Sequence, residues 1–227
     1  GPDTLSAGAH AGSLLVSDAR LLLLPVRSLT SQYRWVTSPE LIARLVRDAK
    51  RLGINMIAAD INGALENDQV LVANGKKDQE ELFLEEFAFS TKQTDLTSLV
   101  SLLSKVSGRD EQEISDKLAI VSNDSFSFLC QSAIPVNPHI AIDNAHKTVK
   151  PGALWYEESL PSETILYLAI SATASRSGNK MTANDILGEL QSAQSGLLKD
   201  GSYLQLGGNE TTGMGWCKLT AFNGMEG

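Results

Sequence analysis

The run of six apolar residues at positions 21–26, LLLLPV, limits the possible folds of this chain more than any other segment. A strand without polar alternation is typical of a strand that is covered on both faces of a sheet. Pro25 has no amide donor, so we expect it to interrupt the ladder near the end of this strand. The run is far shorter than the roughly 20 apolar residues that span a bilayer. The sequence therefore predicts a layered fold around a buried sheet, with no membrane partner.

Helix-capping residues place further elements around this strand. The clearest helix begins at Pro39, after a capping box between Thr37 and Glu40, and ends at Gly53. A second helix is predicted over residues 181–194. Strands and helices do not alternate regularly along the chain, which favours an α+β fold. The 227 residues suffice for a single domain with a sizeable core.

Four segments carry strand patterns. Residues 14–27 are predicted to form two strands around a turn, and residues 81–89 one strand with a bulge. Residues 136–158 alternate around a turn and predict a hairpin. Residues 164–173 predict one apolar strand. Together these strands are expected to supply the sheet and its projections.

Charge is unevenly distributed along the chain, although the formal net charge of −8 seems to oppose a nucleic-acid partner. Residues 1–51 carry seven basic and four acidic side chains, whereas residues 52–116 carry five and thirteen. A ligand responds to the charges within a Debye length of about 8–10 Å. An acidic middle segment therefore does not prevent other surfaces from binding phosphate groups.

The two cysteines, Cys130 and Cys217, are far apart and have no neighbouring cysteine at a zinc-binding spacing. The three histidines do not complete such a site either, so no metal ligand is identified from spacing. Reduced structural cysteines and the absence of an export pattern in this sequence predict a cytoplasmic protein.

A glycine-rich segment, GGNETTGMG at residues 207–215, lies between two predicted strands. Glycine lets successive backbone amides face outward, and such amides form a concavity that suits phosphate oxygens. The alternative is a hairpin bend that needs glycine only to turn. The segment is neither a P-loop nor a dinucleotide-binding fingerprint, because no Gly-Lys-Ser/Thr and no helix follow. The candidate residues here are Gly207, Gly208, Gly213 and Gly215.

Two other stretches combine basic and aromatic or histidine side chains. Arg27 and Arg34, with Tyr33 and Trp35, could bind a nucleic-acid backbone and stack its bases. Alternatively, the two aromatic residues simply cover the start of the first helix.

The predicted hairpin also carries His139, His146, Lys147 and Lys150, which could wedge into a nucleic-acid strand. An ordinary exposed hairpin is equally compatible with these residues. Adjacent carboxylates elsewhere point to opposite faces of a strand and are interpreted as solubility charges; these pairs are Glu80–Glu81, Glu85–Glu86 and Glu157–Glu158.

Several segments together resemble one family. VSDARLLLLPVRS, RWVTSPELIARL, PVNPHIAIDN, KTVKPGALWYEESLPSET and YLQLGGNETTGMGW resemble the RAMP backbone subunit of the type III-B CRISPR (Cmr) effector complex. The match extends over essentially the whole chain. It implies one RAMP domain over residues 1–227 with a ferredoxin-like (RRM-type) core, a helical acidic insertion near 54–118 and a thumb-like hairpin near 136–158.

The resemblance also implies partners and chemistry. Such subunits stack along CRISPR RNA with further copies of themselves and other Cmr subunits, and the complex cleaves target RNA with a divalent metal such as Mg²⁺. Residues 207–215, with Asn209 and Thr211, match the loop near the guide backbone. The hairpin from His139 to Lys150 is a looser match, and RNA contacts of Arg27 and Arg34 are inferred from their charge.

The start of this sequence differs from the pattern of the family. Residues 1–12 resemble the segment that follows the family's first helix, so we expect the first strand, the catalytic Asp and the first RNA-contacting helix to lie outside this sequence. No catalytic residue is therefore assigned. Two alternatives stay open: a stand-alone phosphate- or nucleotide-binding enzyme that uses the glycine-rich loop, and a purely structural interaction protein.

Overall fold

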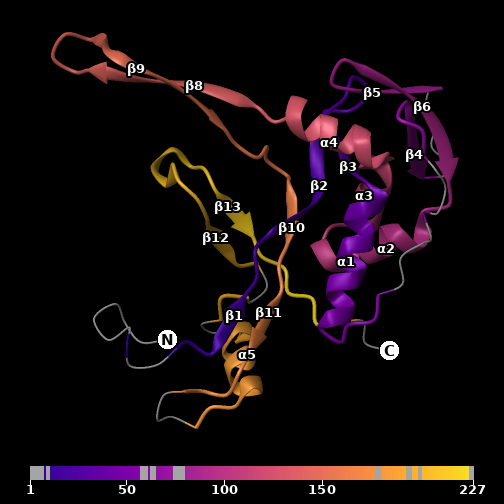
Figure 1. Ribbon diagram of the computed structural model, residues 1–227, viewed down its shortest axis with the longest axis vertical. Coiled ribbons are helices and arrows are strands. Elements are labelled where there is room, and N and C mark those ends of the chain that lie inside the picture. The colour runs from indigo at the N-terminus through magenta and orange to yellow at the C-terminus, as the bar shows by residue number, and fades with distance from the viewer. Residues whose placement is uncertain are drawn as a thin grey trace.

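The body of the protein is a seven-stranded mixed sheet covered by helices on both faces (Figure 1). The computed structural model describes residues 8, 11–56, 61, 65–73, 80–176, 180–192, 196–198 and 201–224. In spatial order the strands are β10 (Ile165–Tyr167), β2 (Arg20–Arg27), β3 (Tyr33–Thr37), β7 (Leu118–Val121), β4 (Gln69–Ala73), β6 (Phe87–Thr94) and β5 (Glu81–Leu84). No helix in the described ranges is long and apolar enough to cross a membrane. The predicted α+β class is confirmed.

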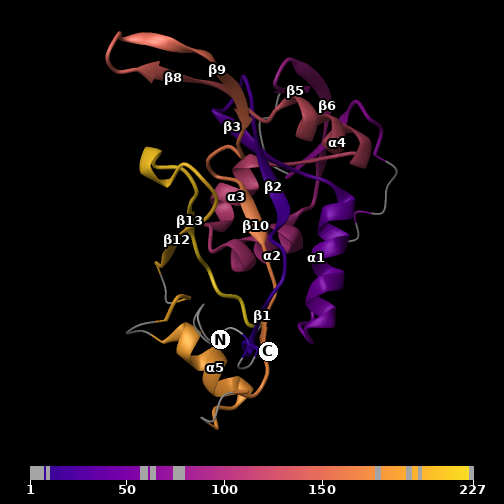
Figure 2. The ribbon, with the colours of Figure 1, turned by 60° about the vertical axis from the view of Figure 1, so that its left-hand side comes forward.

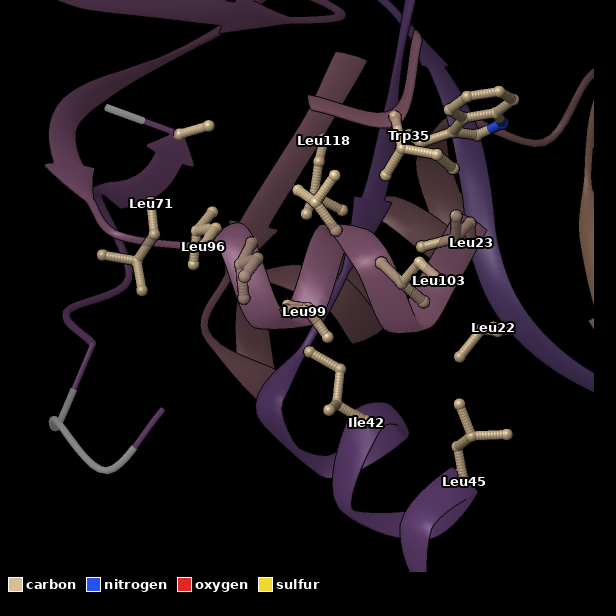
Figure 3. Packing of buried hydrophobic residues seen from close by; sticks show 14 residues of the cluster. Leu22, Leu23, Trp35, Ile42, Leu45, Leu71, Leu96, Leu99, Leu103 and Leu118 are labelled. Atoms are coloured by element: carbon tan, nitrogen blue, oxygen red, sulfur yellow. The ribbon is translucent and has the colours of Figure 1, made fainter. Parts of the chain in front are cut away.

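In the described residues, the helices that accompany the sheet are α1 (Pro39–Arg51), α2 (Thr97–Ser107), α3 (Glu111–Lys117), α4 (Asn123–Ser132) and α5 (Ala183–Gln191). The helices α1, α2 and α3 pack on one face, where Ile42 and Leu103 belong to the same buried cluster as Trp35 of β3 (Figure 3). Ile114 of α3 belongs to this cluster as well. The helix α4 packs on the opposite face through Phe126 and Leu129. The first four helices thus enclose the sheet, and α5 contributes no buried residue.

The strand β2 confirms the prediction of a strand buried on both faces. Leu23 faces the cluster under α1 and α2, whereas Leu24 and Val26 face the cluster under α4. All three side chains are fully buried. Pro25 does not end β2, because β10 pairs only as far as Leu23 and Pro25 needs no partner on that side.

Within the part of the chain that the structure describes, three two-stranded sheets extend from this body (Figure 1). They are β1 (Leu14–Val16) with β11 (Ile170–Ala172), β8 (Val136–Asp143) with β9 (Thr148–Glu158), and β12 (Tyr203–Gln205) with β13 (Trp216–Lys218). Every buried hydrophobic residue in the described ranges lies between Leu22 and Leu129. The extensions therefore have no buried core of their own.

The strands over residues 14–27 and 164–173 differ from the prediction. The strands β1 and β2 do not pair with each other, since β1 pairs with β11 and β2 pairs with β10 and β3. The predicted single strand over 164–173 is accordingly divided into β10 and β11. At the break, the Ser17 amide donates to the Ala169 carbonyl at 3.0 Å, and the Ala169 amide donates to Ser17 Oγ at 2.9 Å. Residues 14–27 and 164–173 therefore run side by side, first in the two-stranded sheet of β1 and β11 and then in the seven-stranded sheet.

The bulge predicted within residues 81–89 is wrong, because the segment is a hairpin of β5 and β6. Leu84 pairs directly with Phe87, which leaves Glu85 and Glu86 as the turn. Glu85 has φ +52°, and its carboxylate accepts hydrogen bonds of 2.6–3.2 Å from the Arg27 guanidinium. Its amide donates to the Arg27 carbonyl at 2.9 Å. An arginine outside the segment thus stabilises a turn without glycine.

The ends of the predicted helices also need correction. Ser38 is the N-cap of α1 without a side-chain capping bond, so the predicted capping box is absent. Instead, the Glu40 amide donates to Asn123 Oδ1 of α4 at 3.1 Å. At α5 a capping box joins Thr182 and Asp185. That helix ends at Gln191, and part of its predicted end falls outside the described residues.

Stability should depend on the core between residues 22 and 129. We expect Leu23→Ala to lower the free energy of unfolding by about 2–5 kcal/mol, because it leaves a cavity under α1 and α2. Leu154→Ala in the exposed hairpin should cost less than about 0.5 kcal/mol. Urea unfolding of both variants measures the difference. Equal losses would contradict a core confined to the body.

Candidate nucleic-acid interface

The β8–β9 hairpin has two chemically different faces. Its register places Pro138 opposite Tyr156 and Ile140 opposite Leu154, and these four side chains are exposed. Directly opposed residues share a face, and successive residues alternate. The other face therefore carries Asn137 opposite Glu157 and His139 opposite Trp155, whereas Val136 opposite Glu158 lies on the first face. The first face is mostly apolar, and the other combines aromatic and polar groups.

A stacked ring pair forms the centre of the polar face. The rings of His139 and Trp155 have centroids 5.4 Å apart and an interplanar angle of 17°. The Trp155 indole Nε1 donates to Glu157 Oε1 at 2.8 Å, which fixes the orientation of the ring. His139 Nε2 lies 3.5 Å from Glu157 Oε2. Trp155 is still 43% exposed, so part of its ring is open to a ligand.

The tip of the hairpin holds the predicted basic residues. Asp143 begins the turn, and a hydrogen bond of 2.9 Å with His146 Nδ1 holds the pKa of Asp143 below its ordinary value. Lys147 follows in the left-handed region with φ +54°. Lys150 lies in the irregular part of β9, where the pairing register with β8 shifts between Ile140 and Ile142. Both lysines are exposed.

The glycine-rich loop connects β12 and β13 through a short 3-10 turn at Glu210–Thr212. A Cβ on Gly215 would lie 2.0 Å from the Leu206 carbonyl oxygen, so glycine is required there for the turn. Gly208 has open space around it and no positive φ. The need for a tight turn therefore explains the glycine at position 215. It does not explain the glycine at position 208, where a side chain would fit.

Some backbone amides of this loop donate hydrogen bonds within the protein, and others do not. Those of Thr212 and Gly213 donate to carbonyls within the turn, at 3.0 Å each. Among the groups that the structure describes, the amides of Gly207, Gly208 and Asn209 have no hydrogen-bond acceptor. Exposed successive amides of this kind suit an anion such as a phosphate group.

A side-chain hydrogen bond joins the loop to the hairpin. Asn209 Nδ2 donates to Glu157 Oε2 at 2.8 Å, and Asn209 itself has φ +59°. Hydrogen bonds from Trp155 first and Asn209 second, together with the nearby His139, lower the pKa of Glu157. Both views show the loop and the hairpin on the same side of the molecule (Figure 2). The structure thus brings Asn209 of the loop to the part of the hairpin that carries His139 and Glu157. Gly207, Gly208, Thr211, Gly213 and Gly215 lie in the same loop as Asn209, whereas Lys147 and Lys150 lie toward the tip of the hairpin, beyond the register shift.

The two predicted arginines lie elsewhere. Arg27 is exposed, but its guanidinium is held by Glu85 at the β5–β6 turn. Arg34 is only 6% exposed, and its Nη1 donates to the Asp116 carbonyl at 2.7 Å. A buried guanidinium in this position stabilises the body and presents no surface to RNA, so we leave Arg34 out of the interface. Trp35 is fully buried in the cluster under α1 and α2, so its ring is not available to stack on a base.

Two residues of the interface were missed from the sequence. Trp155 was not singled out, and Glu157 was interpreted as a solubility charge. The alternation along β9 places both on the face of His139, and this pattern was visible in the sequence. In the ranges that the structure describes, no cluster of three or more His, Cys, Asp or Glu residues could hold a metal ion.

Both the sequence and the fold of this chain are similar to those of known proteins. The RAMP superfamily model matches residues 3–218. Among characterised proteins, the chain is similar to the CRISPR system Cmr endoribonuclease Cmr4 of Pyrococcus furiosus, with 34% identity over 229 residues. This alignment covers 97% of the chain and 72% of the relative.

Solved structures share the architecture. The crystal structure of oligomeric Cmr4 from Pyrococcus furiosus has a TM-score of 0.64 and 28% identity, over 94% of this chain and 74% of that one. The cryo-EM structure of the type III-B Cmr-beta bound to cognate target RNA has a TM-score of 0.66, over 93% of this chain and 70% of that one. At 19% identity the latter shows the fold alone. The predicted RAMP core, consistent with a ferredoxin-like architecture, is confirmed.

The contact between loop and hairpin should depend on pH through Glu157. Because its pKa is lowered, the contact is fully present above the ordinary glutamate value of about 4.3 and is lost as the pH falls through the lowered pKa. We expect the NMR signal of the Trp155 indole proton to shift with a midpoint below that ordinary value. The Glu157→Gln variant should not show this step. A midpoint above the ordinary value would contradict the assignment.

Proposed function

This chain belongs to the RAMP superfamily, and we propose that it is an RNA-binding backbone subunit of a type III-B (Cmr) CRISPR effector complex. The observation that carries the proposal is the juxtaposition of the glycine-rich loop and the hairpin, joined by Asn209 and Glu157. The similarity to a relative named Cmr4 supports the same assignment. CRISPR RNA and target RNA are the proposed ligands, and the cytoplasm is the proposed location.

Three features of the interface suit single-stranded RNA. The amides of Gly207, Gly208 and Asn209 can donate to phosphate oxygens. The partly exposed ring of Trp155 can stack on a base, an interaction that tolerates any base sequence. The lysines at the tip of the hairpin can add charge contacts to the backbone. The acidic surplus of residues 52–116 belongs to a different part of the chain from both interface segments.

The apolar face of the hairpin supports contacts with other subunits. Ile140, Leu154 and Tyr156 are each more than half exposed. Contiguous exposed apolar side chains mark interaction surfaces. The chain also buries no hydrophobic residue after Leu129 in the ranges that the structure describes. We propose that further copies of the chain and other Cmr subunits cover these surfaces, as the similarity to a relative crystallised as an oligomer suggests.

Cleavage of target RNA is proposed for the assembled complex. The endoribonuclease name belongs to the relative, and no residue of this chain is assigned as catalytic. The described residues do not gather a ligand set that fits Mg²⁺, so no step is derived through a metal. The metal requirement expected from the family stays a prediction. The similarity to Cmr proteins does not favour the stand-alone enzyme or the purely structural protein.

A substitution at Gly208 distinguishes a loop that binds phosphate from a loop that needs glycine only to turn. Since a side chain at Gly208 meets open space, we expect Gly208→Leu to fold normally and to weaken binding of a single-stranded RNA by about tenfold, as its side chain blocks the amides. Fluorescence anisotropy measures the affinity, and circular dichroism measures the fold. The wild-type affinity should also fall as salt rises.

A matched control is Gly188→Leu, because Gly188 lies in α5 and also has open space around it. This variant should bind RNA like the wild type. Wild-type binding that is unmeasurable or independent of salt would contradict the proposed function. Equal binding by both variants and the wild type would show that Gly208 serves no phosphate contact.

A further inference from the structure

Glu157 occupies an unusual position for a carboxylate in an RNA interface. It lies on the hairpin face that carries Trp155, between the ring stack and the glycine-rich loop. A negative charge in this place repels phosphate groups and opposes binding. The neighbouring Glu158 has the same charge but lies on the opposite face, where it pairs with Val136. A role of Glu157 in RNA binding therefore requires a favourable contribution to the binding free energy that offsets this repulsion.

The contacts of Glu157 supply such a contribution. One carboxylate oxygen accepts from Trp155 of β9, and the other accepts from Asn209 of the glycine-rich loop, both at 2.8 Å. The second oxygen also faces His139 of β8 at 3.5 Å. A single side chain thus contacts both strands of the hairpin and the loop.

No other polar contact joins these two segments in the part of the chain that the structure describes. The hydrogen bonds and ion pairs of residues 136–158 and 206–215 include one that crosses between them, from Asn209 to Glu157. Neither segment has a buried core to hold it in place. In the described residues, this carboxylate therefore supplies the one polar contact between the two segments.

We propose that Glu157 is a positioning residue that locks the glycine-rich loop to the hairpin, so that both meet one RNA strand at a fixed separation. This inference rests on the proposed function and deepens it. Without the lock, the phosphate-binding amides and the Trp155 ring move independently, and RNA binding must order them. The lock thus lowers the entropic cost of binding, although its charge repels the ligand.

The sign of the effect on affinity separates this proposal from a simple charge effect. Loss of a carboxylate near RNA should strengthen binding if only charge matters. Under the proposal, Glu157→Ala instead weakens binding of a labelled single-stranded oligoribonucleotide by about three- to tenfold. Glu158→Ala is the matched control, which should bind as tightly as the wild type or slightly more tightly.

A donor–acceptor exchange provides a rescue. Asn209→Asp alone places two carboxylates together and should weaken binding, while Asp tolerates the left-handed backbone of residue 209. Combined with Glu157→Gln, it reverses the hydrogen bond, because the glutamine amide then donates to the aspartate. The double variant should recover most of the affinity lost in the Asn209→Asp variant.

Hydrogen–deuterium exchange of the intact chain, measured without RNA, tests whether Glu157 holds the loop and the hairpin together. Glu157→Ala should raise amide exchange in both segments, 136–158 and 206–215, whereas Glu158→Ala should not. The proposal is overturned if Glu157→Ala binds RNA as tightly as Glu158→Ala, or if the double variant behaves like Asn209→Asp alone. If the wild type binds no RNA, the proposed function fails, and the exchange data still decide whether the lock exists.

Discussion

The burial of β2 between two helical layers is the constraint on which the rest of the structure depends. Leu23 packs under α1 and α2, and Leu24 and Val26 pack under α4. The same strand pairs with β10 at the edge of the sheet. The residues after Leu129 bury no hydrophobic side chain where the structure describes them. They attach to the body through the pairing of β10 with β2 and through side-chain contacts, such as the hydrogen bond from Trp35 Nε1 to the Glu163 carbonyl.

This division between core and extensions explains the character of the interface. A hairpin with no core beneath it can expose both faces, and here each face has a different chemistry. The polar face meets the glycine-rich loop, while the apolar face is free for another protein surface. The acidic surplus lies in residues 52–116, outside the hairpin and the glycine-rich loop, so the net charge of the whole chain does not describe the charge of this face.

Local patterns in the sequence predicted the elements better than their partners. The apolar run at residues 21–26 predicted a strand buried on both faces, and the alternation over residues 136–158 predicted the hairpin. The pairing of β1 with β11 could not be predicted, since it joins residues more than 150 positions apart. The turn at Glu85 was missed because Arg27, far along the chain, stabilises its unusual backbone.

The candidate site shows the same limit. Glycine spacing identified the loop, and basic residues identified the tip of the hairpin, but their contact depends on a hydrogen bond between residues 52 positions apart. Arg34 was selected for its charge, yet its position on a central strand buries it. Strand alternation, applied to charged residues as well as apolar ones, would have grouped His139, Trp155 and Glu157.

Cross-linking to RNA tests the central claim most directly, namely that the loop and the hairpin form one RNA-binding surface. The intact chain is bound to single-stranded RNA containing 4-thiouridine, irradiated and analysed by mass spectrometry. The account predicts cross-links in both segments, residues 153–158 and 206–216, at neighbouring nucleotides of one strand. Cross-links confined to other parts of the body, or to only one of the two segments, would contradict it.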